Sequence, residues 1–458
     1  MKLKSMMLHK IKLFAILCIV GILATACSKE NTDKNTDTNT DTNTDTNTDT
    51  NADMNTDSKE KSDIVLNSDA KLTVWFSLST EENDTLQAIA DEYKNKTGIE
   101  VEVLDSNFFA VRQKFPLAAE TSERPDIIYL QSADLGALVE SGYLKKIEFV
   151  DEEVRSRFEE VGFDAFTYNG SLYGVCHSIE AYGIIYNKAT VSEIPNTWNE
   201  YFEVAKANTV ADEHYGTLIA PSNYWFMYPI IKNYGGYYIG MDENGYNIED
   251  IGLDNDGTIA AVNKLLELKN DKLTLQTYTE TDNNISQKFS LGMVDMFIYG
   301  LYDSSKYTAA GIDYGYAPLP DNDDGIPSKP LSTVHGFSIN AYSKYPAEAE
   351  NFLSYILQDE YQQILYEAGN SGDLKTGARN TCNKSVMNSD YVQSSELLKS
   401  LMEVGKTGEV FPTNPEATVI WNSVDTALKS IYFDNAPVKE KLTELAEKVK
   451  ADMKQMRN

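Results

Sequence analysis

Aromatic and acidic side chains are abundant enough in this chain to form a ligand site. Its 458 residues include 28 Tyr, 17 Phe and 4 Trp, with 70 acidic against 40 basic residues. Aromatic rings pack against the apolar C–H face of a sugar ring, while carboxylates and amides bond to its hydroxyl groups. The composition therefore suits a carbohydrate ligand. A large core also takes up aromatic residues, so composition alone leaves both interpretations open.

The sequence contains none of the common catalytic or nucleotide-binding motifs. It has no G-x-x-x-x-G-K-[ST] loop, no H-E-x-x-H helix, no G-x-S-x-G turn and no convincing set of zinc ligands. Cys176 adjoins His177, but neighbouring residues on a strand point to opposite faces, so we expect Cys176 to pack in the core. No two carboxylates stand out as a glycosidase pair. We therefore predict no catalytic residue, no metal site and no cofactor.

Charge and cysteine content exclude several other classes of protein. The formal net charge is −30, and Lys and Arg form no dominant block, which argues against a nucleic-acid partner. Four cysteines cannot form a disulfide scaffold in a chain of this length. The only segment apolar enough to enter a bilayer is at the N-terminus, which excludes a multispanning membrane protein.

Residues 1–26 have the layout of a secretory signal. Four Lys residues within 1–12 precede an apolar run at 13–26, which is too short for a comfortable transmembrane helix. The stretch A-T-A-C that ends at Cys27 resembles the lipobox of bacterial lipoproteins, in which the cysteine becomes the lipid-carrying N-terminus. We predict lipidation at Cys27, with an ordinary cleaved signal as the alternative.

An Asn-Thr-Asp repeat follows the signal. Residues 31–57 contain no large apolar side chain apart from Met54, so we predict that 27–62 form a disordered spacer. The repeat lacks the glycine turn that organises a calcium loop. A lipid anchor and a spacer predict a cell-surface protein of a Gram-positive-type envelope. Its only membrane contact would be the lipid, and its globular domain would span 63–458.

The globular part alternates strand and helix patterns. Short apolar runs at 72–76, 100–104 and 126–130 alternate with helical spacing at 82–97 and 111–121. This β-α-β-α-β order predicts a mostly parallel sheet covered by helices. Because the domain is too long for one core, we expect an α/β chain of two lobes with a ligand cleft between them.

Short segments in a fixed order along residues 70–450 carry a family pattern. They are K-L-T-V-W-F at 71–76, T-G-I-E-V-E-V at 97–103, R-P-D-I-I-Y at 124–129, I-E-A-Y-G-I-I-Y-N at 179–187, G-G-Y-Y-I-G at 235–240 and V-I-W-N-S-V-D-T-A at 419–427. Together they resemble the maltose- and maltodextrin-binding type of extracellular solute-binding protein, which serves ABC sugar importers.

The resemblance implies a two-lobed periplasmic-binding-protein-like fold with a hinge and an interlobe cleft. Lobe 1 would hold about 70–178 plus 336–385, and lobe 2 about 182–333 plus 390–458. Members of this family close around a ligand and present it to a permease. The resemblance therefore implies a monomeric binding protein rather than an enzyme.

The resemblance also matches individual positions to the family's ligand residues. Glu180 matches a carboxylate at the hinge edge of the cleft, and Trp421 matches a stacking Trp on the C-terminal helix. Trp225 falls where the family keeps a stacking Tyr, and Tyr302 where it keeps a Trp. Asn223 replaces a Glu. These positions imply a site that combines stacking with hydrogen bonding.

Other positions depart from the family pattern. The first loop offers Ser79 and Glu81 in place of an Asp-Lys pair, and Asp134 stands where the family has Arg. On the last cleft helix, Asn422 and Asp425 replace Tyr and Arg. The loss of basic residues makes the predicted cleft acidic. An anionic sugar is therefore disfavoured, because an unpaired like charge is costly to desolvate.

We expect a lipid-anchored protein that binds a neutral oligosaccharide, a maltodextrin-like α-glucan first, and delivers it to an ABC importer permease. Another oligosaccharide of galactoside or xyloside type, or a cationic solute, is the alternative within the same class. A surface glycosidase would need two buried carboxylates about 5–10 Å apart, one of them with a raised pKa. A surface adhesin would not need a closing cleft.

Overall fold

The computed structural model describes residues 65–76, 78–106, 108–242, 245–370 and 379–457. The predicted signal, the lipidation site Cys27 and the predicted spacer lie outside the described residues and stay predictions. Among the described helices, none combines the length and apolarity needed to cross a membrane.

The first sheet contains the predicted β-α-β-α-β unit and adds strands from later in the chain. β1 pairs in parallel with β2 and β3, whereas β13 runs antiparallel to β3 and β6. The expected parallel sheet is therefore confirmed for its first three strands only. The strand order is β14 (Glu409–Val410), β13 (Leu331–Ile339), β3 (Ile127–Gln131), β1 (Lys71–Phe76) and β2 (Glu100–Asp105), with β6 (Val175–Glu180) paired to β13.

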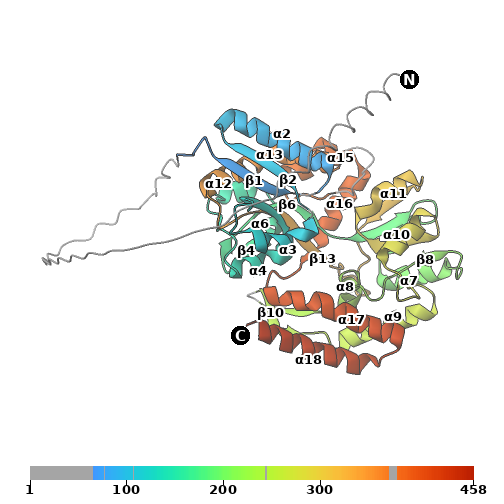
Figure 1. Cartoon of the computed structure of the whole chain (residues 1–458). Helices are drawn as coiled ribbons and strands as arrows, with labels where there is room; N and C mark the ends of the chain where they lie inside the picture. Colours follow the sequence, from blue (N-terminus) through green and yellow to red (C-terminus); the bar gives the residue numbers. More distant parts are fainter. Residues whose placement is uncertain (1–64, 77, 107, 243–244, 371–378, 458) are drawn as a thin grey trace, which may run out of the picture. The chain divides into compact units, whose positions relative to one another are not determined.

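Amphipathic helices cover this first sheet (Figure 1). In α2 (Thr80–Thr97), Leu86, Ile89, Ala90 and Tyr93 are buried, because their spacing of three or four residues places them on one face. The remaining helices and the small hairpin of this part are α3 (Phe108–Ala118), α4 (Leu135–Glu140), α5 (Glu152–Ser156), α6 (Glu160–Asp164), α12 (Pro346–Ile356), α13 (Asp359–Gly369), β4 (Thr167–Tyr168) and β5 (Ser171–Leu172).

The second sheet is mostly antiparallel and so departs from the expected parallel pattern. Its order is β12 (Tyr314–Ala317), β7 (Gly183–Asn187), β11 (Val294–Tyr299) and β8 (Tyr215–Thr217). Only β11 and β8 pair in parallel. The nearby helices and hairpin are α7 (Trp198–Ala207), α8 (Tyr224–Asn233), β9 (Ile239–Asp242), β10 (Gly245–Ile251), α9 (Asp256–Asn270), α10 (Asp282–Ser290), α11 (Ser304–Ala309), α14 (Lys384–Met387), α15 (Asp390–Gln393), α16 (Glu396–Thr407), α17 (Thr418–Asp434) and α18 (Val438–Met456).

Each sheet has its own hydrophobic core, which gives the predicted two-lobed fold. One core takes buried residues from 70–179 and 334–365, together with Cys382. The other takes residues from 181–331 and 386–453, with Ala133 and Tyr366. We call the parts around these cores lobe 1 and lobe 2; the finer boundaries predicted from the resemblance stay a prediction.

Two of the crossings of the chain between the lobes are made at neighbouring strands, and a further crossing lies between Cys382 of the lobe 1 core and Val386 of the lobe 2 core. β6 in lobe 1 is followed directly by β7 in lobe 2, and β13 begins in the lobe 2 core at Leu331 and enters the lobe 1 core at Val334. The two crossings lie side by side, because Glu180 at the end of β6 pairs with Thr333 of β13. These strands form the floor of the cleft described next.

Candidate ligand-binding cleft

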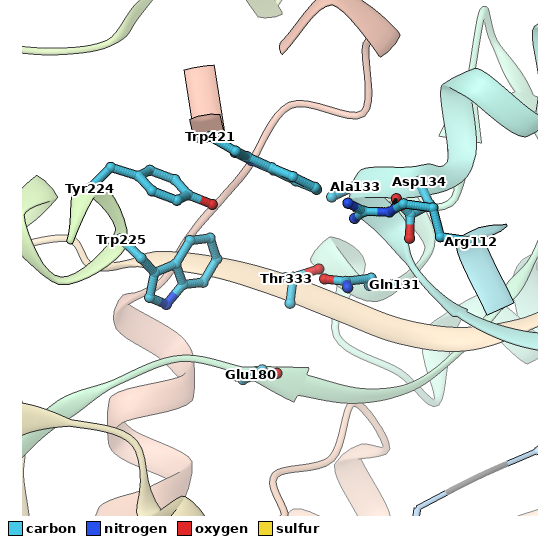
Figure 2. Close-up of a pocket in the computed structure, with 9 residues that line it drawn as sticks. All are labelled: Arg112, Gln131, Ala133, Asp134, Glu180, Tyr224, Trp225, Thr333 and Trp421. Atoms are coloured by element: carbon cyan, nitrogen blue, oxygen red, sulfur yellow. Dashed lines mark ion pairs between the residues drawn. The ribbon is translucent and has the colours of Figure 1, made fainter. Parts of the chain in front are cut away.

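A cavity of about 330 Å³ lies at the two crossing strands. Its volume falls at the lower end of the range for small-molecule sites. Figure 2 shows aromatic side chains on one side of the cavity and polar side chains on the other. The lining comes from both lobes and from the crossing strands: Arg112, Gln131, Ala133, Asp134, Glu180, Tyr224, Trp225, Thr333 and Trp421.

Three aromatic residues of lobe 2 form one wall. Tyr224 and Trp225 open α8, with ring centroids 6.2 Å apart and planes at 76°. Trp421 projects from α17 and packs against Phe411 at 5.6 Å. Its indole Nε1 is buried and has no hydrogen-bond partner among the described residues. Trp421 therefore contributes to this wall through its ring.

The start of α8 is held by side chains that fix this aromatic wall. Asn223 caps the helix, since its Oδ1 accepts hydrogen bonds from the backbone N–H groups of Trp225 and Phe226 at 3.0 and 3.4 Å. Asp425 of α17 accepts the backbone N–H of Tyr224 at 2.7 Å. The Tyr182 hydroxyl donates to the Trp225 carbonyl. Hydrogen bonds from α17 and from the segment between β6 and β7 therefore fix the backbone that carries the two rings.

Lobe 1 supplies a charged pair on the opposite wall. Arg112 of α3 bonds through Nε to Asp134 Oδ1 at 2.6 Å, and its guanidinium lies 4.3 Å from the ring centroid of Trp421. Asp134 ends the short helix η1 (Ser132–Asp134), which follows β3 directly. Burial raises the pKa of Asp134 even though the charge of Arg112 acts in the other direction. One arginine thus links a buried carboxylate of lobe 1 to the aromatic wall of lobe 2.

Glu180 occupies the floor of the cleft. Its Oε2 lies 3.2 Å from Nε2 of His335 on the adjacent strand β13. Burial, the largest single influence, acts to raise the pKa of Glu180, but the hydrogen bonds with His335 and Tyr302 and the charges of His335 and Arg379 together leave that pKa lowered. Glu180 therefore presents an ionised carboxylate that can accept hydrogen bonds from ligand hydroxyls.

Two further carboxylates lie behind the aromatic wall. Burial raises the pKa of Asp425 to about 6, and burial likewise raises the pKa of Asp282 to about 6. The charge of Asp425 adds to the shift at Asp282, whose Oδ2 accepts a hydrogen bond from Asn223 Nδ2 at 2.7 Å. Within the part of the chain that the structure describes, no cluster of His, Cys, Asp and Glu could hold a metal ion. The arrangement can bind a polyhydroxylated ligand by stacking and hydrogen bonding.

The sequence profile of the bacterial extracellular solute-binding proteins matches residues 88–399. The chain belongs to this family. Its members are binding proteins, not enzymes, so the predicted family and non-enzymatic class are confirmed.

Curated relatives of this solute-binding protein match most of its length. The galactooligosaccharide-binding protein of Bacillus subtilis (strain 168) is 23% identical over 402 residues, covering 86% of this chain and 93% of the relative. The maltodextrin-binding protein MdxE of the same strain is 25% identical over 382 residues, covering 82% and 87%.

Solved structures are similar over the whole described fold. A cyclo/maltodextrin-binding protein complexed with maltotetraose has a TM-score of 0.76 and 26% identity, covering 83% of this chain and 96% of that one. An extracellular solute-binding protein from Staphylococcus aureus in complex with maltose has a TM-score of 0.74 and 22% identity, covering 85% and 99%. The predicted two-lobed fold class is confirmed.

Four residues that the sequence assigned to the site of this solute-binding protein line its cavity: Asp134, Glu180, Trp225 and Trp421. A fifth, Tyr302, lies in η2 (Leu301–Asp303) and lines a smaller neighbouring cavity with Glu180, His335 and Arg379. The structure thus brings four of the ten predicted ligand residues together around one space.

Four other predicted site residues lie away from the cavity lining. Asn223 and Asp425 hold the start of α8, as described above. Ser79 caps α2, where its hydroxyl accepts the backbone N–H of Glu82 at 3.0 Å, and Glu81 is exposed on the first turn of that helix. The side chain of Asn422 lies outside what the structure describes.

Sequence reasoning missed five of the lining residues: Arg112, Gln131, Ala133, Tyr224 and Thr333. Tyr224 adjoins the predicted Trp225 and could have been found from that position. Thr333 faces Glu180 only through strand pairing, and Gln131 and Arg112 reach the cavity only once β3 and α3 are placed beside α17. Nothing in the local sequence of Arg112 points to a contact with a tryptophan more than 300 residues further along the chain.

Proposed function

We propose that this solute-binding protein binds a neutral oligosaccharide, with a maltodextrin-like α-glucan as the first candidate, and delivers it to the permease of an ABC importer. The observation that carries the proposal is the wall formed by Tyr224, Trp225 and Trp421 opposite hydrogen-bonding side chains of lobe 1. Aromatic faces bind the C–H side of a sugar, and polar groups bind its hydroxyls.

The polar side chains of the cavity include both hydrogen-bond donors and hydrogen-bond acceptors for sugar hydroxyls. Glu180 and Asp134 offer carboxylate acceptors, Arg112 offers donors, and Gln131 and Thr333 can both donate and accept. A neutral sugar needs both kinds of partner, because each hydroxyl donates and accepts. A cationic solute would meet Arg112 on the same wall, which makes it a weaker fit to this cavity.

A galactooligosaccharide is the second candidate ligand. It is favoured by the similarity to the galactooligosaccharide-binding protein of Bacillus subtilis, which matches over nearly the same length as the maltodextrin-binding relative. The two sugars differ in hydroxyl orientation and linkage while keeping apolar faces, so the aromatic wall suits both.

Isothermal titration calorimetry of the purified protein tests the ligand class. We expect saturable binding to maltotriose or maltohexaose, or to a galactooligosaccharide if the second candidate holds, and no conversion of the sugar on long incubation. Detectable binding of polyamines, with no detectable binding of any sugar, would overturn the sugar proposal. Chemical turnover of a bound sugar would overturn the binding-protein role.

We further propose that the protein acts as a monomer at the extracellular face of the membrane, lipid-anchored at Cys27, with 27–62 as a spacer. The family is extracellular, and one relative is named as a solute-binding lipoprotein. A Cys27→Ala variant should pass from the membrane fraction into the medium with unchanged sugar affinity. Retention of that variant in the membrane would contradict the anchor.

A further inference from the structure

Two buried cysteines of lobe 1 meet at one point behind the cleft. Cys176 lies on β6 and Cys382 just before α14, and both are fully buried with free thiols. A Cβ built on Gly162 of α6 would lie 2.7 Å from Sγ of Cys176, 3.0 Å from its Cβ and 3.2 Å from Cβ of Cys382. The two Cβ atoms are therefore no more than about 6 Å apart.

Backbone hydrogen bonds fix Cys382 in this place independently. The Glu159 N–H donates to the carbonyl of Cys382 at 2.8 Å, and the Lys384 N–H donates to the carbonyl of Arg157 at 2.9 Å. These bonds hold the segment with Cys382 against the start of α6, where Gly162 faces both cysteines. A disulfide needs Cβ atoms about 3.5–4.5 Å apart, a separation that lies within this upper limit or a small backbone movement away from it, and rotation about χ1 then brings the two sulfur atoms together.

We propose that Cys176 and Cys382 form a disulfide in the exported protein, which locks the segment at 379–383 to strand β6. The oxidant is a small-molecule or protein disulfide. A thiolate of one cysteine attacks it, expels one thiol and forms a mixed disulfide. The second cysteine then attacks the protein sulfur and expels the second thiol, so two protein thiols and one disulfide give one protein disulfide and two thiols.

The oxidising conditions outside the cell and the burial of the two thiols indicate where and when this disulfide forms. Extracellular proteins meet oxidising conditions in which disulfides persist. Burial raises the pKa of the Cys382 thiol, and the neighbouring Cys176 thiol adds to the effect, so thiolate is scarce in the folded protein. The bond therefore forms during folding rather than afterwards. The disulfide would link β6, which ends at Glu180, to the segment that contains Arg379. Nε of Arg379 lies 3.3 Å from Oε1 of Glu82.

Peptide mapping tests the proposal on the whole protein. The protein is unfolded in urea with reductant, refolded in a mixture of oxidised and reduced glutathione, treated with iodoacetamide and digested. We expect the Cys176 and Cys382 peptides to be joined, two hydrogens lighter than their sum. Alkylation or glutathionylation of both cysteines, or a link from either to Cys18 or Cys27, would overturn the proposal.

Thermal unfolding provides a second readout with a matched control. The refolded wild type should lose several degrees of Tm when reductant is added, because the bond closes a loop of about 200 residues and constrains the unfolded chain. A Cys382→Ala variant keeps the Cys176 thiol alone, and its Tm should be insensitive to reductant. Equal responses of the two proteins to reductant would contradict a stabilising disulfide.

Discussion

At the scale of single residues, Trp421 is the side chain on which the sugar proposal depends most. Its ring faces the cavity, and its Nε1 is a buried donor. We expect Trp421→Ala to weaken oligosaccharide binding by about 2–4 kcal/mol, the range for a desolvated aromatic anchor, measured by calorimetry. Trp421→Phe keeps a stacking ring and removes the N–H, so it should lose less. If both variants bind as tightly as wild type, Trp421 is a packing residue only.

Arg112 gives the second prediction at this scale. Its Nε is used by Asp134, and its remaining N–H donors are available for ligand hydroxyls beside the Trp421 ring. We expect Arg112→Met, which keeps an unbranched stem, to weaken sugar binding by about 1.5–3 kcal/mol, the range for hydrogen bonds to charged groups. Titration calorimetry measures this loss.

The control for Arg112 is an arginine of the same lobe outside the cavity lining. Arg124 donates from Nη1 to the Thr121 carbonyl at 2.7 Å, and Arg124→Met should leave the affinity unchanged. Arg112→Lys distinguishes the contribution of the positive charge from that of the planar guanidinium donors. Lysine keeps the charge near Asp134 but lacks the planar group with several N–H donors. Affinity that is unaltered in Arg112→Met would place Arg112 outside ligand recognition.

The residues that sequence could predict are those carried by a local motif. Trp421 lies within V-I-W-N-S-V-D-T-A and Glu180 within I-E-A-Y-G-I-I-Y-N, and both line the cavity. Asn223 and Asp425 were matched in the same way, yet the structure uses their oxygens to hold the start of α8. A position in a pattern fixes where a side chain stands, but its hydrogen-bond partners depend on elements that meet only in the folded chain.

At the scale of elements, the start of α8 brings carboxylates and helix N–H groups together. The folded pKa of Asp425 is raised from 3.8 to about 6, so the folded state binds more protons than the unfolded state between these values. Stability from this group is therefore greatest at low pH and falls as pH rises towards 7. Neutralising Asp425 should remove this loss.

Asp425→Asn is the matching test, since an Asn oxygen can still accept the Tyr224 N–H. We expect the variant to equal wild type near pH 4 and to exceed it by about 1–2 kcal/mol near pH 7, after allowance for partial exposure. Urea unfolding from pH 4 to 7.5 measures the difference. Asp434→Asn, at the exposed end of the same helix, should show no such pH-dependent gain. A gain that is the same at every pH would contradict the titration of Asp425.

Helices and strands were predicted correctly where the spacing of apolar residues alone defines them. The direction of strand pairing was not predicted where the paired strands are distant in the sequence. The spacing in α2 and the strands β1, β2 and β3 follow their patterns closely. The helix expected at 111–121 is instead α3 at Phe108–Ala118, with Pro116 inside it, so it begins and ends three residues earlier than its pattern predicts. The antiparallel second sheet was missed, since strand direction depends on how the chain returns from lobe 1.

At the scale of the whole molecule, the contact between Arg112 and Trp421 joins the lobes across the cleft. Arg112 belongs to α3 of lobe 1 and Trp421 to α17 of lobe 2, while β6 and β13 connect the lobes below them. A ligand that contacts both of these side chains in the cavity would gain contacts from both lobes at once. Hinge closure around ligand is therefore favoured by every contact that the second lobe adds.

The final prediction is that ligand changes the distance between the lobes. Small-angle scattering of the purified protein should show a smaller radius of gyration when an oligosaccharide that binds in calorimetry is added. Trp421→Ala is the matched control, because without the ring the bound sugar loses its main contact with lobe 2. That variant should compact only at much higher sugar concentration. Tight sugar binding with no compaction would mean that the cleft binds without closing, as expected of an adhesin rather than an importer's binding protein.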